Sequence, residues 1–343
     1  MTGFAGRLAG AWYAPRLTVL AVLLWPLSQV FGAVVAIRRA LYRSGALRSE
    51  RVGAPVVVVG NLTAGGSGKT PLALALADAL AARGRRPGFV SRGYGGSAAS
   101  ARAVVPGDDP RVVGDEPLLL AASGHPVWIG RRRVDAARRL LAAHPDVDVV
   151  IADDGLQHYA LARECEIVVV DATRGFGNGL LLPAGPLREP VSRLAHVDAI
   201  VQLETVPHGA AVHLPAAVGL RSTMRLEPQA WRNLRNPDLR ADPSAWPRGR
   251  VHAIAGIGHP VRFFELLRSL GLEAACHPFP DHHAFTPADL DIAGAAAILM
   301  TEKDAVKCTA FADDRCWCLP VRARIDAALV DCVLARFDGR QAA

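Results

Sequence analysis

The sequence predicts an α/β fold in which a parallel β-sheet carries helices on both faces. Apolar, β-branched runs of strand length alternate with Ala- and Leu-rich segments of helix length, which is typical of a parallel sheet covered on both sides. The first such run, 56–59, is followed by a glycine-rich loop and a helix-like segment. Strand, glycine loop and helix in this order indicate a sheet of the P-loop NTPase type. A smaller C-terminal α/β domain and an apolar N-terminal helix complete the predicted architecture.

The N-terminus carries an apolar stretch. Residues 17–37 form a run of 21 residues without charge, and a helix of that length would be about 31 Å long, close to the hydrocarbon thickness of a bilayer. Pro26 and Gln29 interrupt the run. We expect a helix inserted in, or lying on, the cytoplasmic leaflet, with Arg38 and Arg39 at the lipid phosphates. A membrane-spanning helix, a signal peptide and a buried core helix are the alternatives.

The glycine-rich loop is a candidate phosphate-binding loop. Its eight residues are Thr63, Ala64, Gly65, Gly66, Ser67, Gly68, Lys69 and Thr70. Backbone N–H groups and a helix N-terminus would surround the phosphates of ATP. Lys69 would reach the β- and γ-phosphates, and the Thr70 hydroxyl would bind Mg²⁺. Thr63 stands where the usual pattern has glycine, but the three glycines that follow supply the conformational freedom the loop needs.

The remaining elements follow in chain order. Six strands are expected, at 56–59, 87–91, 127–130, 148–152, 166–170 and 199–203, with helices at 72–83 and 133–144. The stretch 208–250 is irregular and rich in proline, which favours a domain junction. A second α/β pattern follows, with strands at 251–255 and 295–300 and a helix that ends near 270.

These patterns divide the chain into three predicted parts. Residues 1–45 are the membrane-associating helix, residues 46–215 the P-loop domain, and residues 216–343 the smaller α/β domain. The composition is that of a folded basic protein, with 51% apolar residues and a formal net charge of +7. Such a charge favours acidic partners such as a nucleotide, a phosphorylated substrate or anionic lipid. No nucleic-acid-binding motif occurs in the sequence, and no obligate protein partner is evident.

Two residue classes are used sparingly. The six cysteines form no C-x-x-C pair, so we expect reduced thiols in the cytosol. Only three lysines, Lys69, Lys303 and Lys307, stand beside 36 arginines. Lys69 lies in the phosphate loop, where a compact ammonium suits phosphate better than a planar guanidinium. The same argument makes the other two candidate functional residues, and the alternative is chance placement.

Acidic residues complete the candidate site. Asp153 and Asp154 follow the expected strand 148–152, and a carboxylate at the carboxyl end of a strand beside a phosphate loop holds Mg²⁺ directly or through water. Phosphoryl transfer to an alcohol also needs a base. Asp115 is a candidate base, but it could equally begin a helix, since acidic residues favour the first turn. His282 follows an aspartate, and that pair is either catalytic or a surface turn.

Taken together, the motifs resemble those of the tetraacyldisaccharide 4′-kinase family, the lipid A 4′-kinases of Gram-negative bacteria. The resemblance covers nearly the whole chain, and the threonine that opens the phosphate loop is part of it. The motifs that carry it are 59–71, 91–96, 113–117, 153–158, 175–179, 182–189, 256–260, 281–282 and 301–307.

The resemblance implies a reaction and the roles of several residues. ATP would phosphorylate the 4′-hydroxyl of a tetraacylated glucosamine disaccharide 1-phosphate, giving the bis-phosphorylated lipid A precursor. It further implies that Asp115 is the base, assisted by His282, and that Asp153 and Asp154 serve Mg²⁺. Tyr94 would pack near the nucleotide. Two arginines would face the 1-phosphate or anionic lipid, or would instead lie on solvated helix faces: Arg133 and Arg188.

The resemblance also implies a location. A substrate with four acyl chains lies in the membrane, so we expect the enzyme at the cytoplasmic face of the inner membrane, attached through its N-terminus. One alternative is a membrane-attached P-loop ATPase or GTPase that acts as a switch or chaperone and needs no acceptor base. Another is a non-catalytic membrane adaptor, against which the intact Lys69, Thr70 and Asp153 argue.

Overall fold

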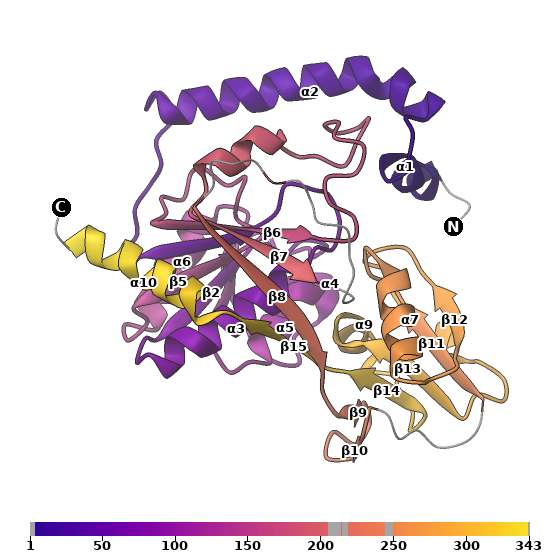
Figure 1. The fold of residues 1–343 in the computed structure, drawn as a ribbon. Helices are drawn as coiled ribbons and strands as arrows, with labels where there is room; N and C mark the ends of the chain where they lie inside the picture. The colour runs from indigo at the N-terminus through magenta and orange to yellow at the C-terminus, as the bar shows by residue number, and fades with distance from the viewer. Residues whose placement is uncertain (1–3, 205–213, 215–218, 244–249, 342–343) are drawn as a thin grey trace.

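The computed structural model describes residues 4–204, 214, 219–243 and 250–341 of the chain. Figure 1 shows two sheets with a long helix, α2, lying across the larger one. The larger sheet has the strand order β15-β8-β7-β6-β1-β5-β2-β4-β3, and the smaller has the order β10-β9-β14-β13-β11-β12.

The nine-stranded sheet is parallel except at its two edges, where β3 and β15 run antiparallel to their neighbours. Its strands are β1 (Val56–Gly60), β2 (Pro87–Ser91), β3 (Arg102–Val104), β4 (Val127–Ile129), β5 (Val149–Asp153), β6 (Cys165–Asp171), β7 (Ala199–Glu204), β8 (Leu220–Pro228) and β15 (Val321–Ile325). β1 lies at the centre between β5 and β6, which explains why it reads as an unbroken run of valine. Gly60 and Asp153 therefore both lie at the carboxyl ends of neighbouring strands, on the same side of the sheet, as predicted.

Two apolar cores cover the two faces of this sheet. Val57 and Val59 face one core, and Val56 and Val58 face the other, as the two-residue period of a strand requires. The first core holds α3 (Lys69–Ala82), α5 (Asp115–Ala121) and α10 (Ala327–Gln341); the second holds α6 (Arg133–Ala143) and the 3-10 helix η1 (Val191–His196). A further short helix, α4 (Pro110–Val113), precedes α5. The predicted sheet with helices on both faces is thus confirmed.

The six-stranded sheet has four parallel strands, and the β9–β10 hairpin pairs with them antiparallel. Its strands are β9 (Trp231–Asn233), β10 (Arg240–Ala241), β11 (Val251–Ala255), β12 (Ala275–Pro278), β13 (Ala297–Thr301) and β14 (Cys316–Leu319). Its helices are α7 (Pro260–Ser269), α8 (Pro287–Leu290) and α9 (Glu302–Cys308).

A single division at residue 215 does not separate the two sheets. β8 and β15 both pair within the nine-stranded sheet, and α10 packs on α3. The chain therefore enters the smaller sheet after residue 228 and returns to the larger one at residue 321. Part of the stretch predicted as irregular, 208–250, forms strands, because β8, β9 and β10 lie within it; residues 208–213, 215–218 and 244–249 lie outside the described residues. The limits of independently folding domains stay a prediction.

The N-terminal segment forms α1 (Phe4–Trp12) and α2 (Val19–Arg43). Within the described part of the chain, α2 is the one helix long and apolar enough to cross a membrane. One of its contacts with the rest of the protein is made by Ser28, which is buried and whose Oγ donates to the carbonyl of Leu181 at 2.9 Å. Leu23 is 71% exposed and Val19 77%. The alternative of a buried core helix is therefore wrong.

Candidate active site

The phosphate loop joins β1 to α3 beyond the carboxyl ends of the parallel strands of the larger sheet. Gly68 precedes the first residue of α3 with φ of +88°, and Gly65 has φ of +101°, a region that favours glycine. Ser67 Oγ is buried and has no hydrogen-bond partner among the described residues. The loop therefore presents a helix N-terminus and an unused hydroxyl, an arrangement that suits phosphate oxygens.

Asp153 lies beside the loop, at the end of β5. Thr70 Oγ1 donates to Asp153 Oδ2 at 2.9 Å, while Oδ1 is buried without a hydrogen-bond partner in the described chain. Burial, together with the charge of Glu116, raises the pKa of Asp153 to about 7. A hydroxyl and a carboxylate with an unused oxygen form the hard oxygen donor set that Mg²⁺ prefers, so these residues fit the metal.

Asp154 is held by cations instead. Arg188 Nη1 donates to both of its carboxylate oxygens, at 2.9 and 3.0 Å, and Lys69 Nζ lies 3.8 Å from Oδ1. Burial raises the pKa of Asp154, but these two charges outweigh burial and lower it to about 2. Arg133 Nη2 donates to the backbone carbonyl of Asp154 at 3.1 Å. Both arginines predicted for the acceptor thus contact Asp154, and the buried Arg133 does not lie on a solvated helix face.

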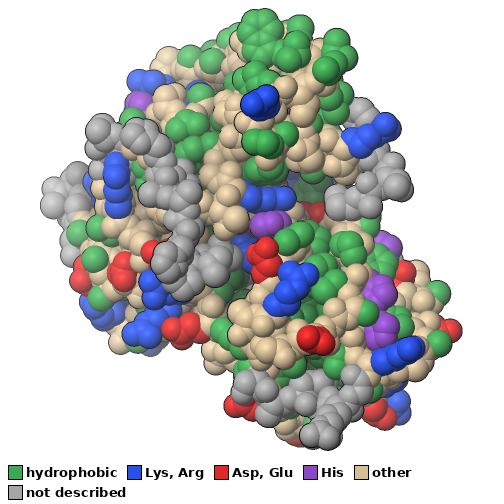
Figure 2. Space-filling view, turned by 45° about the vertical axis from the view of Figure 1, so that its right-hand side comes forward, with side chains coloured by type: hydrophobic (Ala, Val, Ile, Leu, Met, Phe, Trp, Pro, Cys, Tyr) green, Lys and Arg blue, Asp and Glu red, His purple; other side chains and the backbone are tan. Residues whose placement is uncertain are grey.

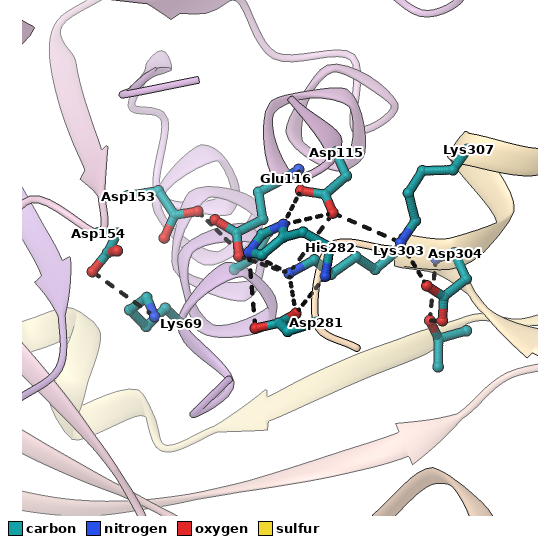
Figure 3. A network of polar contacts seen from close by, with 12 residues as sticks. Lys69, Asp115, Glu116, Asp153, Asp154, Asp281, His282, Lys303, Asp304 and Lys307 are labelled. Carbon is teal, nitrogen blue, oxygen red and sulfur yellow. Dashed lines mark hydrogen bonds and ion pairs between the residues drawn. The ribbon is translucent and has the colours of Figure 1, made fainter. Parts of the chain in front are cut away.

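Asp115 and His282 are in direct contact, although one lies on a helix that packs on the larger sheet and the other in a loop of the smaller sheet. Asp115 is the first residue of α5 and is 5% exposed; His282 lies in the loop after β12, with φ of +59°. His282 Nδ1 lies 3.0 Å from Asp115 Oδ2 and 3.2 Å from Oδ1 (Figure 3). The backbone N–H of His282 donates to the carbonyl of Gly256 at 3.2 Å. The fold therefore forms the pair that the resemblance implied.

Two lysines surround this pair. Lys303 Nζ lies 3.8 Å from Asp115 Oδ2, 3.3 Å from Glu116 Oε1 and 3.5 Å from His282 Nε2. Lys307 Nζ lies 4.0 Å from Asp115 Oδ2. Both come from α9, so the smaller sheet supplies the histidine and both cations (Figure 3). The predicted set of site residues lacked these two lysines, although their rarity in the sequence had marked them.

Asp115 and His282 each stabilise the charged form of the other. Burial raises the pKa of Asp115, but the hydrogen bond with His282 and the charge on Lys303 outweigh it and keep the pKa below 3.8. Burial lowers the pKa of His282, but the hydrogen bond with Asp115 outweighs it and raises the pKa above 6.5. Asp115 is therefore an ionised carboxylate at neutral pH, in a position where little water reaches it.

The loops of the two sheets are in direct contact. A Cβ built on Gly258 would lie 2.5 Å from the backbone N of Gly66, so the glycine after β11 permits this approach. The Tyr94 ring is 60% exposed, and its centroid lies 5.1 Å from that of the His282 ring. Tyr94 thus borders the Asp115–His282 pair; its contact with a nucleotide stays a prediction. Figure 2 shows cationic, acidic and histidine side chains gathered in the hollow between the two lobes.

Comparison with known proteins places this site in a family. The model of the family described as Tetraacyldisaccharide-1-P 4'-kinase matches residues 20–338. The chain belongs to this family. It is 50% identical over 318 residues to a tetraacyldisaccharide 4'-kinase of Azoarcus sp., covering 92% of each chain. It is also 50% identical to one from Chromobacterium violaceum, covering 95% of this chain and 96% of that one.

A solved structure shows the same architecture. LpxK from Aquifex aeolicus, crystallised in complex with ATP, superposes with a TM-score of 0.77 at 26% identity, covering 93% of this chain and all of that one. Family membership confirms the predicted class: the chain is an ATP- and Mg²⁺-dependent kinase of lipid A biosynthesis, and its substrate is a lipid disaccharide. The alternatives of a switch and of a non-catalytic adaptor are thereby excluded.

Proposed function

We propose that Asp115, assisted by His282, is the base that accepts the proton of the acceptor's 4′-hydroxyl. The observation that carries this proposal is the Asp115–His282 contact, in which α5 supplies the carboxylate and the loop after β12 supplies the imidazole. The neighbouring Glu116 lies close enough to Asp153 to raise its pKa, so the base and the metal-binding carboxylate belong to one site. The lowered pKa of Asp115 keeps its carboxylate ionised at neutral pH, which is the form that can accept a proton.

The bond changes follow from this arrangement. The 4′-oxygen forms a bond to the γ-phosphorus, the bond between that phosphorus and the β,γ-bridging oxygen breaks, and the hydroxyl proton passes to a carboxylate oxygen of Asp115. ADP leaves. His282 contacts the carboxylate through Nδ1. Because it is cationic or shares the proton with Asp115, the two residues titrate as one unit, and His282 stabilises that unit after the proton has been transferred.

The phosphate loop supplies the electrostatic part of catalysis. Thr70 and Asp153 would hold Mg²⁺, which when bound neutralises charge on the β- and γ-phosphates. Lys69 carries the cation of the loop, and its contact with Asp154 keeps it beside the phosphate site. Arg188 fixes Asp154 in turn. We therefore assign Asp153 to the metal and Asp154 to the positioning of Lys69.

The function is tested by transfer of labelled γ-phosphate to a purified tetraacyldisaccharide 1-phosphate in detergent micelles. We expect a labelled lipid product with a free 4′-hydroxyl acceptor and none with an acceptor whose 4′-position is blocked. Hydrolysis of ATP at the same rate with both acceptors, without a labelled lipid, would contradict the proposal.

We infer that α2 attaches the enzyme to the cytoplasmic face of the inner membrane. Its exposed apolar side chains, among them Leu23 and Val30, have no cover within the described protein. The last turns of the helix carry arginines that suit anionic lipid phosphates. Since the substrate carries four acyl chains, attachment here would keep the active site at the membrane surface.

Charges on the exposed face of α2 are expected to release the protein from membranes. The double substitution Leu23→Glu and Val30→Glu should weaken binding to anionic phospholipid vesicles about tenfold or more, because each carboxylate opposes burial in lipid. Co-sedimentation with vesicles measures this. Val261→Glu is the matched control, since Val261 is also exposed but lies on α7. Equal binding of all three proteins would contradict the proposed attachment.

The Asp115–His282 contact predicts a pH-dependent contribution to stability. The raised pKa of His282 contributes stability that is fully present below pH 6.5 and is lost as the pH rises through the folded pKa. The lowered pKa of Asp115 contributes stability that is present above pH 3.8 and is lost below it. The apparent Tm of wild type should therefore exceed that of His282→Gln by about 2 °C or more near pH 5, and by less at pH 8. His144→Gln serves as control, and a pH-independent gap would contradict the argument.

A further inference from the structure

A pair of histidines lies on the smaller sheet, outside the set of residues assigned above. His252 is the second residue of β11, and His277 is the third residue of β12. Their rings are stacked, with an interplanar angle of 21° and centroids 5.2 Å apart, and His252 Nδ1 lies 3.0 Å from His277 Nε2. Neither imidazole takes part in the proposed reaction, so that reaction does not explain why the two lie together.

The register of two paired strands brings the imidazoles to one face of the sheet. β11 and β12 run parallel, with His252 opposite Ala275 and Ile254 opposite His277. Since side chains alternate between the two faces of a strand, the histidines are diagonal neighbours on the same face. Cys276 lies on the opposite face, where it borders a cavity beside α7. Its exposed thiol is therefore not a third member of the histidine pair.

The two facing ring nitrogens have nearly the spacing that a shared metal ion requires. A Zn–N bond is about 2.0–2.1 Å long, and tetrahedral geometry then separates two such nitrogens by about 3.3–3.4 Å. The observed 3.0 Å is shorter by a few tenths of an ångström, which small rotations of two half-buried side chains supply. Without a metal, the same contact is a hydrogen bond in which one imidazole donates and the other accepts. Transfer of that proton to the other nitrogen of its ring frees both facing nitrogens for a metal.

The surroundings of the pair favour neutral imidazole and leave room for water. Burial, together with the charges of His277 and Arg250, lowers the pKa of His252 below 6.5, and the neutral ring is the form that binds metal. In the described part of the chain β12 is the edge strand of the smaller sheet (Figure 1), so one side of His277 is open. The described residues contain no group of three or more His, Cys, Asp or Glu that could hold a metal ion. Water would therefore complete the coordination of an ion held by this pair.

We propose that His252 and His277 bind a divalent transition-metal ion, with Zn²⁺ as the representative ion and water at the remaining positions. Imidazole nitrogen suits zinc and its neighbours in the transition series, whereas Mg²⁺ prefers oxygen ligands. The chemistry of this site therefore differs from that of the Mg²⁺ site at the phosphate loop.

An ion at this position would join the two strands that lead to the histidine of the active site. β11 leads into Gly256, and β12 leads into the loop that carries His282. The backbone N–H of His282 donates to the carbonyl of Gly256. A metal ion between His252 and His277 thus stabilises the part of the smaller sheet from which this loop extends.

The test is calorimetric titration of the full-length protein with ZnCl₂ in detergent micelles, at about pH 7.5, with excess Mg²⁺ and no nucleotide. We expect wild type to bind one more equivalent of Zn²⁺ than the double variant His252→Gln, His277→Gln. Each single variant should bind this ion about tenfold more weakly or worse, because it loses one of two protein ligands, and loss of even an outer-shell partner costs about 10–100-fold. Zn²⁺ should also raise the apparent Tm of wild type more than that of the double variant, since a ligand that prefers the folded chain stabilises it.

Two matched variants control for other zinc-binding groups. His196→Gln removes an exposed imidazole at the end of η1 and should bind Zn²⁺ as wild type does. Cys276→Ser should also match wild type, because this thiol lies on the opposite face of the strand. Phosphate transfer at the wild-type rate without added Zn²⁺ verifies that each histidine variant is folded. If the double variant does not fold, the two single variants carry the test.

Two results would overturn the proposal. Equal stoichiometry and affinity for Zn²⁺ in wild type and in the histidine variants would leave the contact as a hydrogen bond between two imidazoles. Loss of the additional equivalent in Cys276→Ser would assign the ion to the thiol instead.

Discussion

Asp115→Asn is expected to lower the kcat of lipid phosphorylation by about 10²–10⁴-fold, the usual contribution of a positioned base. The amide keeps the shape of the carboxylate but cannot accept the hydroxyl proton. ATP binding should persist, because Asp115 contacts His282 and the lysines of α9 rather than the phosphate loop. Initial rates with labelled ATP, beside calorimetric titration of ATP, measure both quantities.

The control for this variant is Asp331→Asn on α10, an exposed carboxylate whose partner is Arg83. It should retain wild-type rates. If Asp115→Asn binds ATP and transfers phosphate within threefold of the wild-type rate, a different group must remove the proton.

Lys69→Met is expected to lower kcat by about 10²–10³-fold, the range for loss of one preorganised donor to developing charge. Methionine has nearly the length of lysine but no charge, so the buried space at this 7%-exposed position stays filled. Asp154 would lose one of its two side-chain cations, while Arg188 would still hold it.

Single-turnover transfer measured at saturating ATP separates this chemical effect from weaker nucleotide binding. A kcat close to that of wild type, with only the KM of ATP raised, would limit Lys69 to ground-state binding. Arg83→Met is a matched control, because it removes an exposed cation from the residue that follows α3.

The parts of the fold that are determined by residues close together in the sequence could be predicted. The valine run, the glycine loop and the helix after it are local signals, and β1, the loop and α3 lie where they were expected. Asp153 followed from the rule that parallel strands end at a common edge. The predicted helix began at residue 72, whereas α3 begins at Lys69. The difference arises because the loop leads directly into the helix through Gly68.

β8 and β15 could not be predicted from periodicity of apolar runs. Both lie at or next to a sheet edge and are exposed at alternate residues, so arginines interrupt their apolar positions. Their pairing also joins segments almost a hundred residues apart. In the described part of 208–250, Pro228 ends β8 and Pro237 lies between β9 and β10, so prolines interrupt the apolar pattern of segments that nevertheless belong to the two sheets.

The catalytic pair lay beyond local sequence analysis. Asp115 and His282 are 167 residues apart, and each alone is compatible with a helix start or a turn, so their roles came from the family resemblance. Lys303 and Lys307 were marked by composition, but only the packing of α9 against α5 brings them to Asp115. The contacts of Arg133 and Arg188 with Asp154 lay beyond local sequence analysis, because these residues are 21 and 34 positions from Asp154 and meet it only in the folded chain; their role toward the acceptor stays a prediction.

The most direct test of the proposal that Asp115 and His282 act together as the base is a double-mutant cycle. It compares the kcat of wild type, Asp115→Asn, His282→Gln and the double variant. If the two residues act as one unit, the double variant should be about as slow as Asp115→Asn alone, because His282 acts through the carboxylate. If the two losses multiply instead, His282 contributes independently of Asp115, and the proposed base pair is contradicted.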